Sequence, residues 1–164
     1  MAKVISIFST DRRGITRRTD MTFTTRLDHA QRLVVFHGKE KLSQEELSQA
    51  LRLFRDPDFP SDYDILNLFD EDIRVEINHD SIVSHAIERQ RTLIEREPGR
   101  QLRSAFVAVP PALKALLDLW PLFFPETDGS LLIRFFDTLE EALAWLEREP
   151  FDVAALEDFP VQPL

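Results

Sequence analysis

The sequence predicts an α/β fold: a mixed sheet of five strands with about four helices, in the order β-β-α-β-α-β-α-β-α. Short apolar runs of strand length alternate with amphipathic segments of helix length, and strands joined by helices form a largely parallel sheet. A turn signal at residues 28–31 joins the first two runs as a hairpin, which makes the sheet mixed.

The five expected strands lie at residues 22–27, 33–36, 63–69, 102–109 and 131–136. The first alternates apolar and polar positions, and Gly38 ends the second. The third, YDILNLF, is almost continuously apolar, which is typical of a strand near the centre of a covered sheet. A further apolar run at residues 4–8 could form a strand, although a polar segment isolates it.

Caps and prolines mark the helix boundaries. Two capping boxes, Ser43 with Glu46 and Thr138 with Glu141, predict where the first and fourth helices begin. Prolines at residues 110–111 open the third helix. The second helix is expected over residues 80–95, after a charged loop at residues 70–78, with four apolar side chains facing inward: Ile82, Ala86, Ile87 and Ile94.

Composition limits the range of functions. Apolar residues make up 43% of the 164 positions and charged residues 30%, as in soluble globular chains. No apolar run approaches the roughly 20 residues that span a bilayer, and the N-terminus lacks a signal-peptide profile. The absence of cysteine excludes disulfides, thiolate zinc sites and cysteine nucleophiles. We therefore expect a cytoplasmic protein without stable membrane insertion.

The charge is unevenly distributed. The net charge of −9 argues against a general affinity for nucleic acid, but residues 1–26 carry +4 and the remainder −13. We expect a basic N-terminal arm at residues 1–21, one domain at residues 22–149 and a C-terminal tail at residues 150–164 that docks on the domain. The arm is either a solvated leader or a contact for an acidic partner.

No catalytic, metal-binding or cofactor-binding motif is present in the sequence. The four glycines are scattered, so there is neither a dinucleotide fingerprint nor a P-loop. His79 and His85 are six residues apart and fall on different faces of a helix, which favours surface or capping roles. The acidic run at residues 70–72 is interpreted as a solvated turn, with a cation or acid–base cluster as the alternative. A further hypothesis is an enzyme that uses the region of Asp70, Asp72, His79 and Asp80.

Asp80 and Ser81 stand where the second crossover helix is expected to begin. Either residue could be a simple N-cap. Alternatively, Ser81 is a phosphoacceptor flanked by Asp80, because a phosphate at a helix N-terminus faces free N–H groups and the positive end of the helix dipole.

Several stretches, in the same order, resemble the STAS domain family of bacterial anti-sigma-factor antagonists and the SpoIIAA-like proteins within it. The best match is AVPPALKALLD at residues 108–118, followed by the apolar strand at 131–136 and EEAL at 140–143. LNL at residues 66–68 is similar to the family's central strand, and GKE at 38–40 to its Gly-acid turn. The resemblance covers residues 22–149.

The resemblance implies a SpoIIAA-like (STAS) fold and a non-enzymatic, regulatory module that binds a protein partner and needs no cofactor. In regulatory members a serine directly after an aspartate, at the start of the second helix, is phosphorylated by a partner kinase, and Asp80-Ser81 matches that pair. The small residues that follow in the family are replaced here by Ile82 and Val83. Because the fold also resembles lipid-carrying Sec14-type domains, binding of a small apolar ligand is the alternative function. A homodimer is left open.

Overall fold

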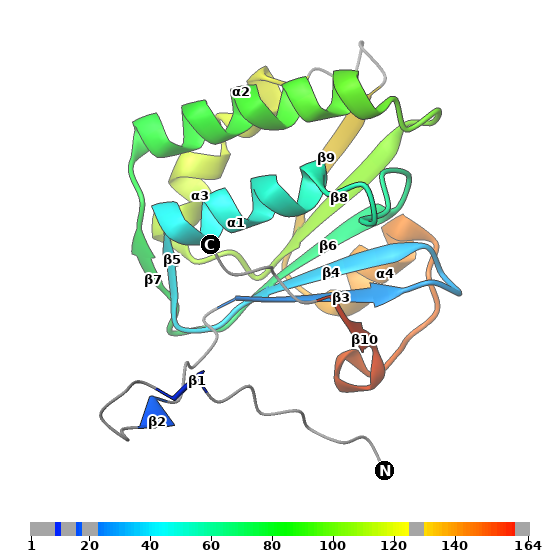
Figure 1. Ribbon diagram of the computed structural model, residues 1–164, viewed down its shortest axis with the longest axis horizontal. Helices are drawn as coiled ribbons and strands as arrows, with labels where there is room; N and C mark the ends of the chain where they lie inside the picture. The colour runs from blue at the N-terminus through cyan, green and yellow to red at the C-terminus, as the bar shows by residue number, and fades with distance from the viewer. Residues whose placement is uncertain (1–8, 11–15, 18–22, 125–129, 160–164) are drawn as a thin grey trace.

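The computed structural model describes residues 9–10, 16–17, 23–124 and 130–159. A six-stranded mixed sheet forms the centre of the described part, in the order β10-β3-β4-β6-β8-β9 (Figure 1). Strands β4, β6, β8 and β9 are parallel, and β3 lies antiparallel between β4 and β10. The bounds are β3 (Phe23–Asp28), β4 (Leu33–Gly38), β6 (Asp64–Phe69), β8 (Leu102–Val107), β9 (Leu131–Phe136) and β10 (Glu157–Asp158).

Helices cover both faces of the sheet. Helices α1 (Gln44–Arg55), α2 (His79–Arg96) and α3 (Pro111–Leu117) lie on one face, and α4 (Leu139–Leu146) lies on the other (Figure 1). The strand order explains this arrangement. Right-handed crossovers between parallel strands that follow one another in sequence and in space place every connecting helix on the same face.

Short elements complete the described structure. Strand β1 (Ser9–Thr10) pairs with β2 (Thr16–Arg17), and β5 (Lys41–Ser43) pairs in parallel with β7 (Arg74–Glu76). Two 3₁₀ turns cover Trp120–Leu122 and Val153–Ala155.

The core divides at the sheet because strand side chains alternate between its faces. In β4, Val34 and Phe36 pack on the α1 side, whereas Leu33 and Val35 pack on the α4 side. No helix in the described ranges is long and apolar enough to cross a membrane.

The predicted α/β class and mixed sheet are confirmed, but the sheet has six strands rather than five. The additional strand, β10, comes from the C-terminal segment, where Glu157 and Asp158 pair with Leu27 and Arg26. Two residues are too few to produce a hydrophobic period, so sequence alone gave no signal for this strand. The strand considered at residues 4–8 lies outside the described residues.

Two further expectations were wrong in detail. The segment at residues 70–78 is not only a loop, since it contains β7. In α2, Ile82 and Ala86 are buried as predicted, but Ile87 is 45% and Ile94 71% exposed. Ile87 follows Ile82 by five residues, which at 100° per residue places it about 140° around the helix from the buried face.

Candidate functional site

A cavity lies between the sheet and helices α1, α2 and α3. Its volume is about 100 Å³, counted as the space open to the centre of a water-sized sphere. For comparison, an engineered apolar cavity of about 150 Å³ stays dry and binds benzene. Most of the wall consists of aliphatic and aromatic side chains from both layers, including Phe36, Phe54, Ile82, Phe106, Leu113 and Trp120.

Of the described residues that line this cavity, five have polar side chains: Asn67 and Ser104 from the sheet, Glu46 from α1, and His85 and Arg89 from α2. Asn67 Nδ2 donates hydrogen bonds to Ser104 Oγ at 3.1 Å and to Ala105 O at 3.0 Å, so its amide group joins neighbouring strands. An apolar cavity with a few convergent polar groups is the usual construction of a small-molecule site.

Arg89 is the basic side chain of the wall, and it is only 6% exposed. Its guanidinium lies over the ring of Phe54, with Cζ 3.6 Å from the ring centroid, and Nη1 donates to Thr92 Oγ1 at 3.1 Å. No carboxylate within the described ranges forms an ion pair with it. Burial, together with the neighbouring charge of Arg96, lowers the pKa of Arg89 to about 9, so the guanidinium stays charged at pH 7.

His85 lies one turn before Arg89 and is also buried. Its ring stacks on Trp120 with a centroid distance of 5.3 Å, and Nδ1 has no hydrogen-bond partner among the described residues. Burial and then the charge of Arg89 lower the pKa of His85 to about 4, although a backbone hydrogen bond with Leu47 acts in the opposite direction. The imidazole is therefore neutral near pH 7.

Glu46 is the acidic side chain of the wall. It is the N3 residue of α1 and completes the predicted capping box, accepting hydrogen bonds from the Ser43 backbone N–H at 2.7 Å and from the Ser43 hydroxyl. Glu46 is therefore engaged at the helix start, where it binds Ser43.

Ser81, the phosphoacceptor candidate, is the third residue of α2. Asn78, rather than Asp80 or Ser81, is the N-cap: its Oδ1 accepts hydrogen bonds from the Ser81 backbone N–H at 2.9 Å and from the Ser81 hydroxyl at 3.0 Å. The side chain of Asp80 is exposed, 3.7 Å from His79 Nδ1. N-capping by Asp80 or Ser81 was thus wrong, whereas phosphorylation of Ser81 stays a prediction.

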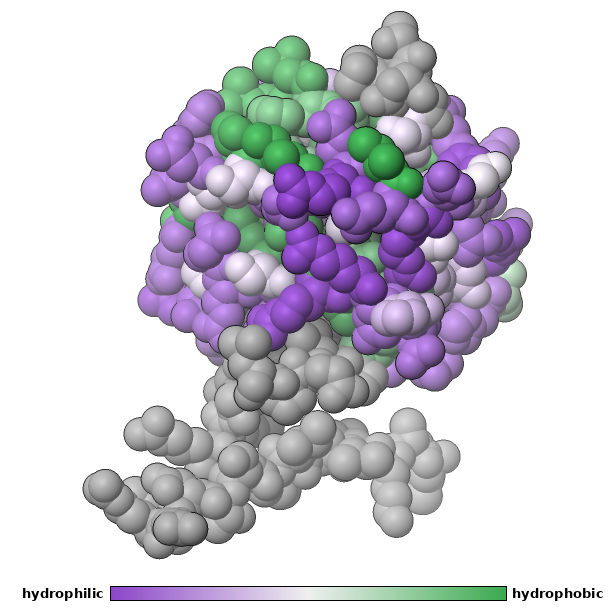
Figure 2. Space-filling model, turned by 45° about the horizontal axis from the view of Figure 1, so that its top comes forward, coloured by the Kyte–Doolittle hydropathy of each residue, from purple (hydrophilic) through white to green (hydrophobic). Residues whose placement is uncertain are grey.

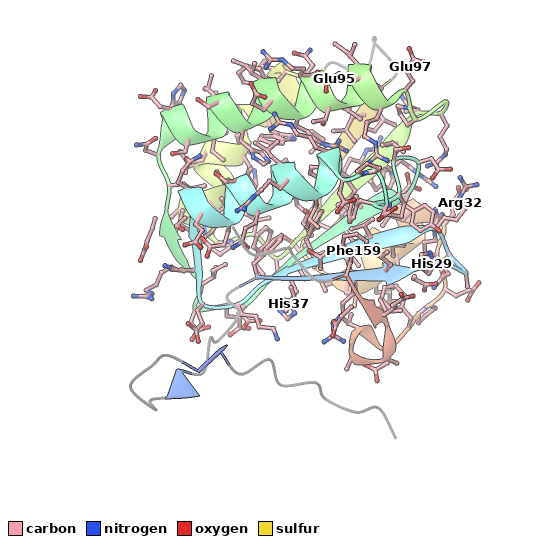
Figure 3. The ribbon with its side chains drawn as sticks, in the orientation of Figure 1. His29, Arg32, His37, Glu95, Glu97 and Phe159 are labelled. Carbon is pink, nitrogen blue, oxygen red and sulfur yellow. The ribbon has the colours of Figure 1, made fainter. Side chains whose placement is uncertain are left out.

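The acidic residues after β6 do not assemble a metal site. His37 Nε2 lies 2.7 Å from Asp70 Oδ1, and His37 projects from the face of the sheet opposite α1 and α2 (Figure 3). Across the parts of the chain that the structure describes, no three histidine or acidic side chains are placed to hold one metal ion. Neither Asp70 nor His79 lines the cavity.

Two polar residues of the cavity wall, His85 and Arg89, were missed by sequence reasoning. His85 was expected at the surface, and Arg89 was not considered. A signal existed: His85 and Arg89 follow Ile82 at i+3 and i+7, so they fall on the face of α2 that carries the buried residues Ala86 and Leu93.

Searches of this chain against protein-family models, against curated proteins and against solved structures find no match.

Proposed function

We propose that the protein is a non-enzymatic, SpoIIAA-like module that binds a small apolar ligand in the cavity between the sheet and helices α1 to α3. The observation that carries this proposal is the cavity of about 100 Å³ between the sheet and the helices. Protein interiors hold few voids larger than a water molecule, so a space of this size with mostly apolar walls favours a guest.

The wall favours binding over catalysis. Among the described residues of the wall the one hydroxyl side chain is that of Ser104, which accepts a hydrogen bond from Asn67 and has none with His85. A hydroxyl nucleophile needs a base within hydrogen-bond reach. We therefore assign the polar wall residues to ligand recognition.

The test is native mass spectrometry of freshly purified protein, combined with calorimetric titration of hexan-1-ol. The variant Ala50→Leu fills the cavity from α1, and Ala144→Leu, at an exposed position of α4, is the matched control. We expect the wild type and Ala144→Leu to carry a non-covalent mass or bind the alcohol, and Ala50→Leu to do neither. Equal binding by Ala50→Leu would exclude the cavity, and an empty, unresponsive wild type would contradict ligand binding.

A second candidate function is regulated protein binding through α2. Ile87 and Ile94 are seven residues apart on the outer face of this helix, and Leu122 of the adjoining 3₁₀ turn is 76% exposed. Gln90, between the two isoleucines, donates from Nε2 to Phe123 O at 3.2 Å, which ties the helix to that turn. Figure 2 shows apolar side chains in separate patches on this side of the molecule, within a mainly hydrophilic surface. Exposed apolar side chains on one face are candidates for contact with a partner.

Ser81 would regulate such a contact from the first turn of the same helix. A phosphate there would replace the hydroxyl that donates to Asn78 Oδ1 and add about −2 charge at the positive end of the helix dipole. The test is affinity capture with wild type, Ser81→Ala, Ser81→Asp and Ile94→Glu as baits. We expect Ile94→Glu to lose a partner and the two serine variants to differ. Identical capture by all four baits would contradict this candidate.

A further inference from the structure

We propose that the ligand of the cavity is an amphiphilic monocarboxylate whose carboxylate pairs with Arg89 and whose short apolar body fills the space against the sheet. This inference rests on the proposed ligand-binding function and adds the charge and chemical class of the ligand. It begins from Arg89, a buried cation without an acidic partner among the described residues.

Burying a charge without a counter-charge is unfavourable, and buried charges in proteins are usually paired. Arg89 has one hydrogen bond, to Thr92, although a guanidinium has five N–H donors. Its contact with the ring face of Phe54 compensates part of the hydration that the guanidinium loses on burial. That contact is not a hydrogen bond to an N–H group. An anion in the cavity would supply the missing partner.

The position of Arg89 fits that role. Arg89, Phe54 and Ile65 line both the cavity of about 100 Å³ and a smaller one of about 10 Å³, so Arg89 lies between the two. The smaller space is about what one water molecule needs. The larger one is the only one of the two with room for an organic molecule.

The single positive charge of Arg89 is balanced by a ligand that carries a single negative charge. A carboxylate matches the planar guanidinium by two parallel N–H···O bonds. A phosphate monoester would bring a second charge into a wall where His85 is neutral and Glu46 is acidic, so it would be poorly compensated. The Ser104 hydroxyl accepts from Asn67 and keeps its own hydrogen as a further donor.

The experiment compares straight-chain carboxylates from butyrate to octanoate with the corresponding alcohols, titrated by calorimetry. The proteins are wild type, Arg89→Met, Arg89→Lys and the control Arg91→Met, which changes an exposed arginine of the same helix. For Arg89→Met we expect carboxylate binding to weaken at least about tenfold, because the hydrogen bonds from the charged guanidinium to the carboxylate are lost. The affinity for the alcohols should change by no more than about twofold. Arg89→Lys should be intermediate, and Arg91→Met should equal wild type.

Each outcome separates the inference from the proposed function. If alcohols bind as tightly as carboxylates and Arg89→Met changes neither, a neutral ligand is indicated and the carboxylate inference fails while the proposed function stands. If Arg91→Met weakens carboxylate binding equally, the effect is non-specific charge and the inference also fails. If no probe binds wild type, both fail.

A direct measurement covers the case in which Arg89→Met does not fold. The Nε–Hε resonance of Arg89, identified by its loss in Arg89→Lys, should shift in wild-type NMR spectra on addition of hexanoate and not of hexan-1-ol. An unchanged resonance at saturating hexanoate would overturn the inference.

Discussion

Asp64 has the most buried acidic side chain of the described structure, and its role is to hold separate segments of the fold together. Asp64, at the start of β6, is fully buried and contacts three arginines. Arg100 donates to both carboxylate oxygens at 3.2 Å, Arg148 donates at 2.9 Å, and the backbone N–H of Arg103 donates at 2.8 Å. The carboxylate thereby ties β6 to the start of β8 and to the chain after α4.

Asp64→Asn should lower the free energy of unfolding by about 3 kcal/mol, because it removes the buried carboxylate that Arg100 and Arg148 share as their counter-charge. Urea unfolding at pH 7 measures this difference. Asp62→Asn is the control, since Asp62 pairs with Arg32 at the surface and such pairs contribute about 1 kcal/mol or less. Equal losses in the two variants would contradict the role assigned to Asp64.

His85 should make stability depend on pH. Its pKa is about 4 in the folded protein and about 6.5 when exposed, so the unfolded chain takes up the proton first as the pH falls. The stability is fully present above pH 6.5 and is lost on the way to pH 4, by on the order of 3 kcal/mol at 1.36 kcal/mol per pKa unit.

The comparison that isolates this effect is wild type against His85→Phe, which keeps a ring against Trp120 but cannot titrate. We expect the urea midpoint of wild type to fall more between pH 7 and pH 4 than that of the variant. His79→Gln, at an exposed position, should behave as wild type. A His85→Phe profile parallel to wild type would show that the titrating group is elsewhere.

At the scale of elements, sequence predicted what is locally encoded. The capping boxes at Ser43 and Thr138 are both present, because their side chains and backbone partners lie within four residues of one another. Strands β7 and β10 were not predicted, because each is too short to show the alternation of apolar and polar residues that identifies a strand. Each of them forms by pairing with a strand distant in sequence. The polar wall residues His85 and Arg89 were missed for a related reason: a helix pattern shows which face is buried but not where packing leaves a cavity.

Strand β10 has a consequence for association. It covers the edge of β3, and the next residue, Phe159, packs edge-on against Phe59 at a centroid distance of 5.2 Å (Figure 3 labels Phe159). Deleting residues 157–164 would leave unpaired the N–H and C=O groups on the side of β3 that faces away from β4, and exposed edges of this kind pair with other chains.

We therefore expect the shortened chain to show a concentration-dependent increase in mass relative to the full chain. Size-exclusion chromatography with light scattering measures it. Phe159→Ala, which keeps β10 but removes the ring, is the control and should lose stability without gaining mass. A shortened chain with the mass behaviour of the full chain would show that β10 does not protect the edge.

At the scale of the whole molecule, the cavity that would bind the ligand also lowers the stability of the fold. A cavity of about 100 Å³ lowers stability by roughly 2 kcal/mol at the 24 cal/mol per Å³ found for engineered cavities. A fold selected only for stability would fill it, and single substitutions that fill cavities are readily found.

Ala50→Leu should accordingly raise the thermal midpoint of the ligand-free protein and abolish the further rise that hexanoate causes in wild type, because a ligand stabilises only the state that binds it. Differential scanning calorimetry with and without hexanoate measures both effects, and Ala144→Leu should show the wild-type response to hexanoate. A stabilised Ala50→Leu that still responds would place the ligand elsewhere. A destabilised Ala50→Leu would mean that the layer between the sheet and the helices is too rigid to accept three more carbon atoms, and would contradict the prediction.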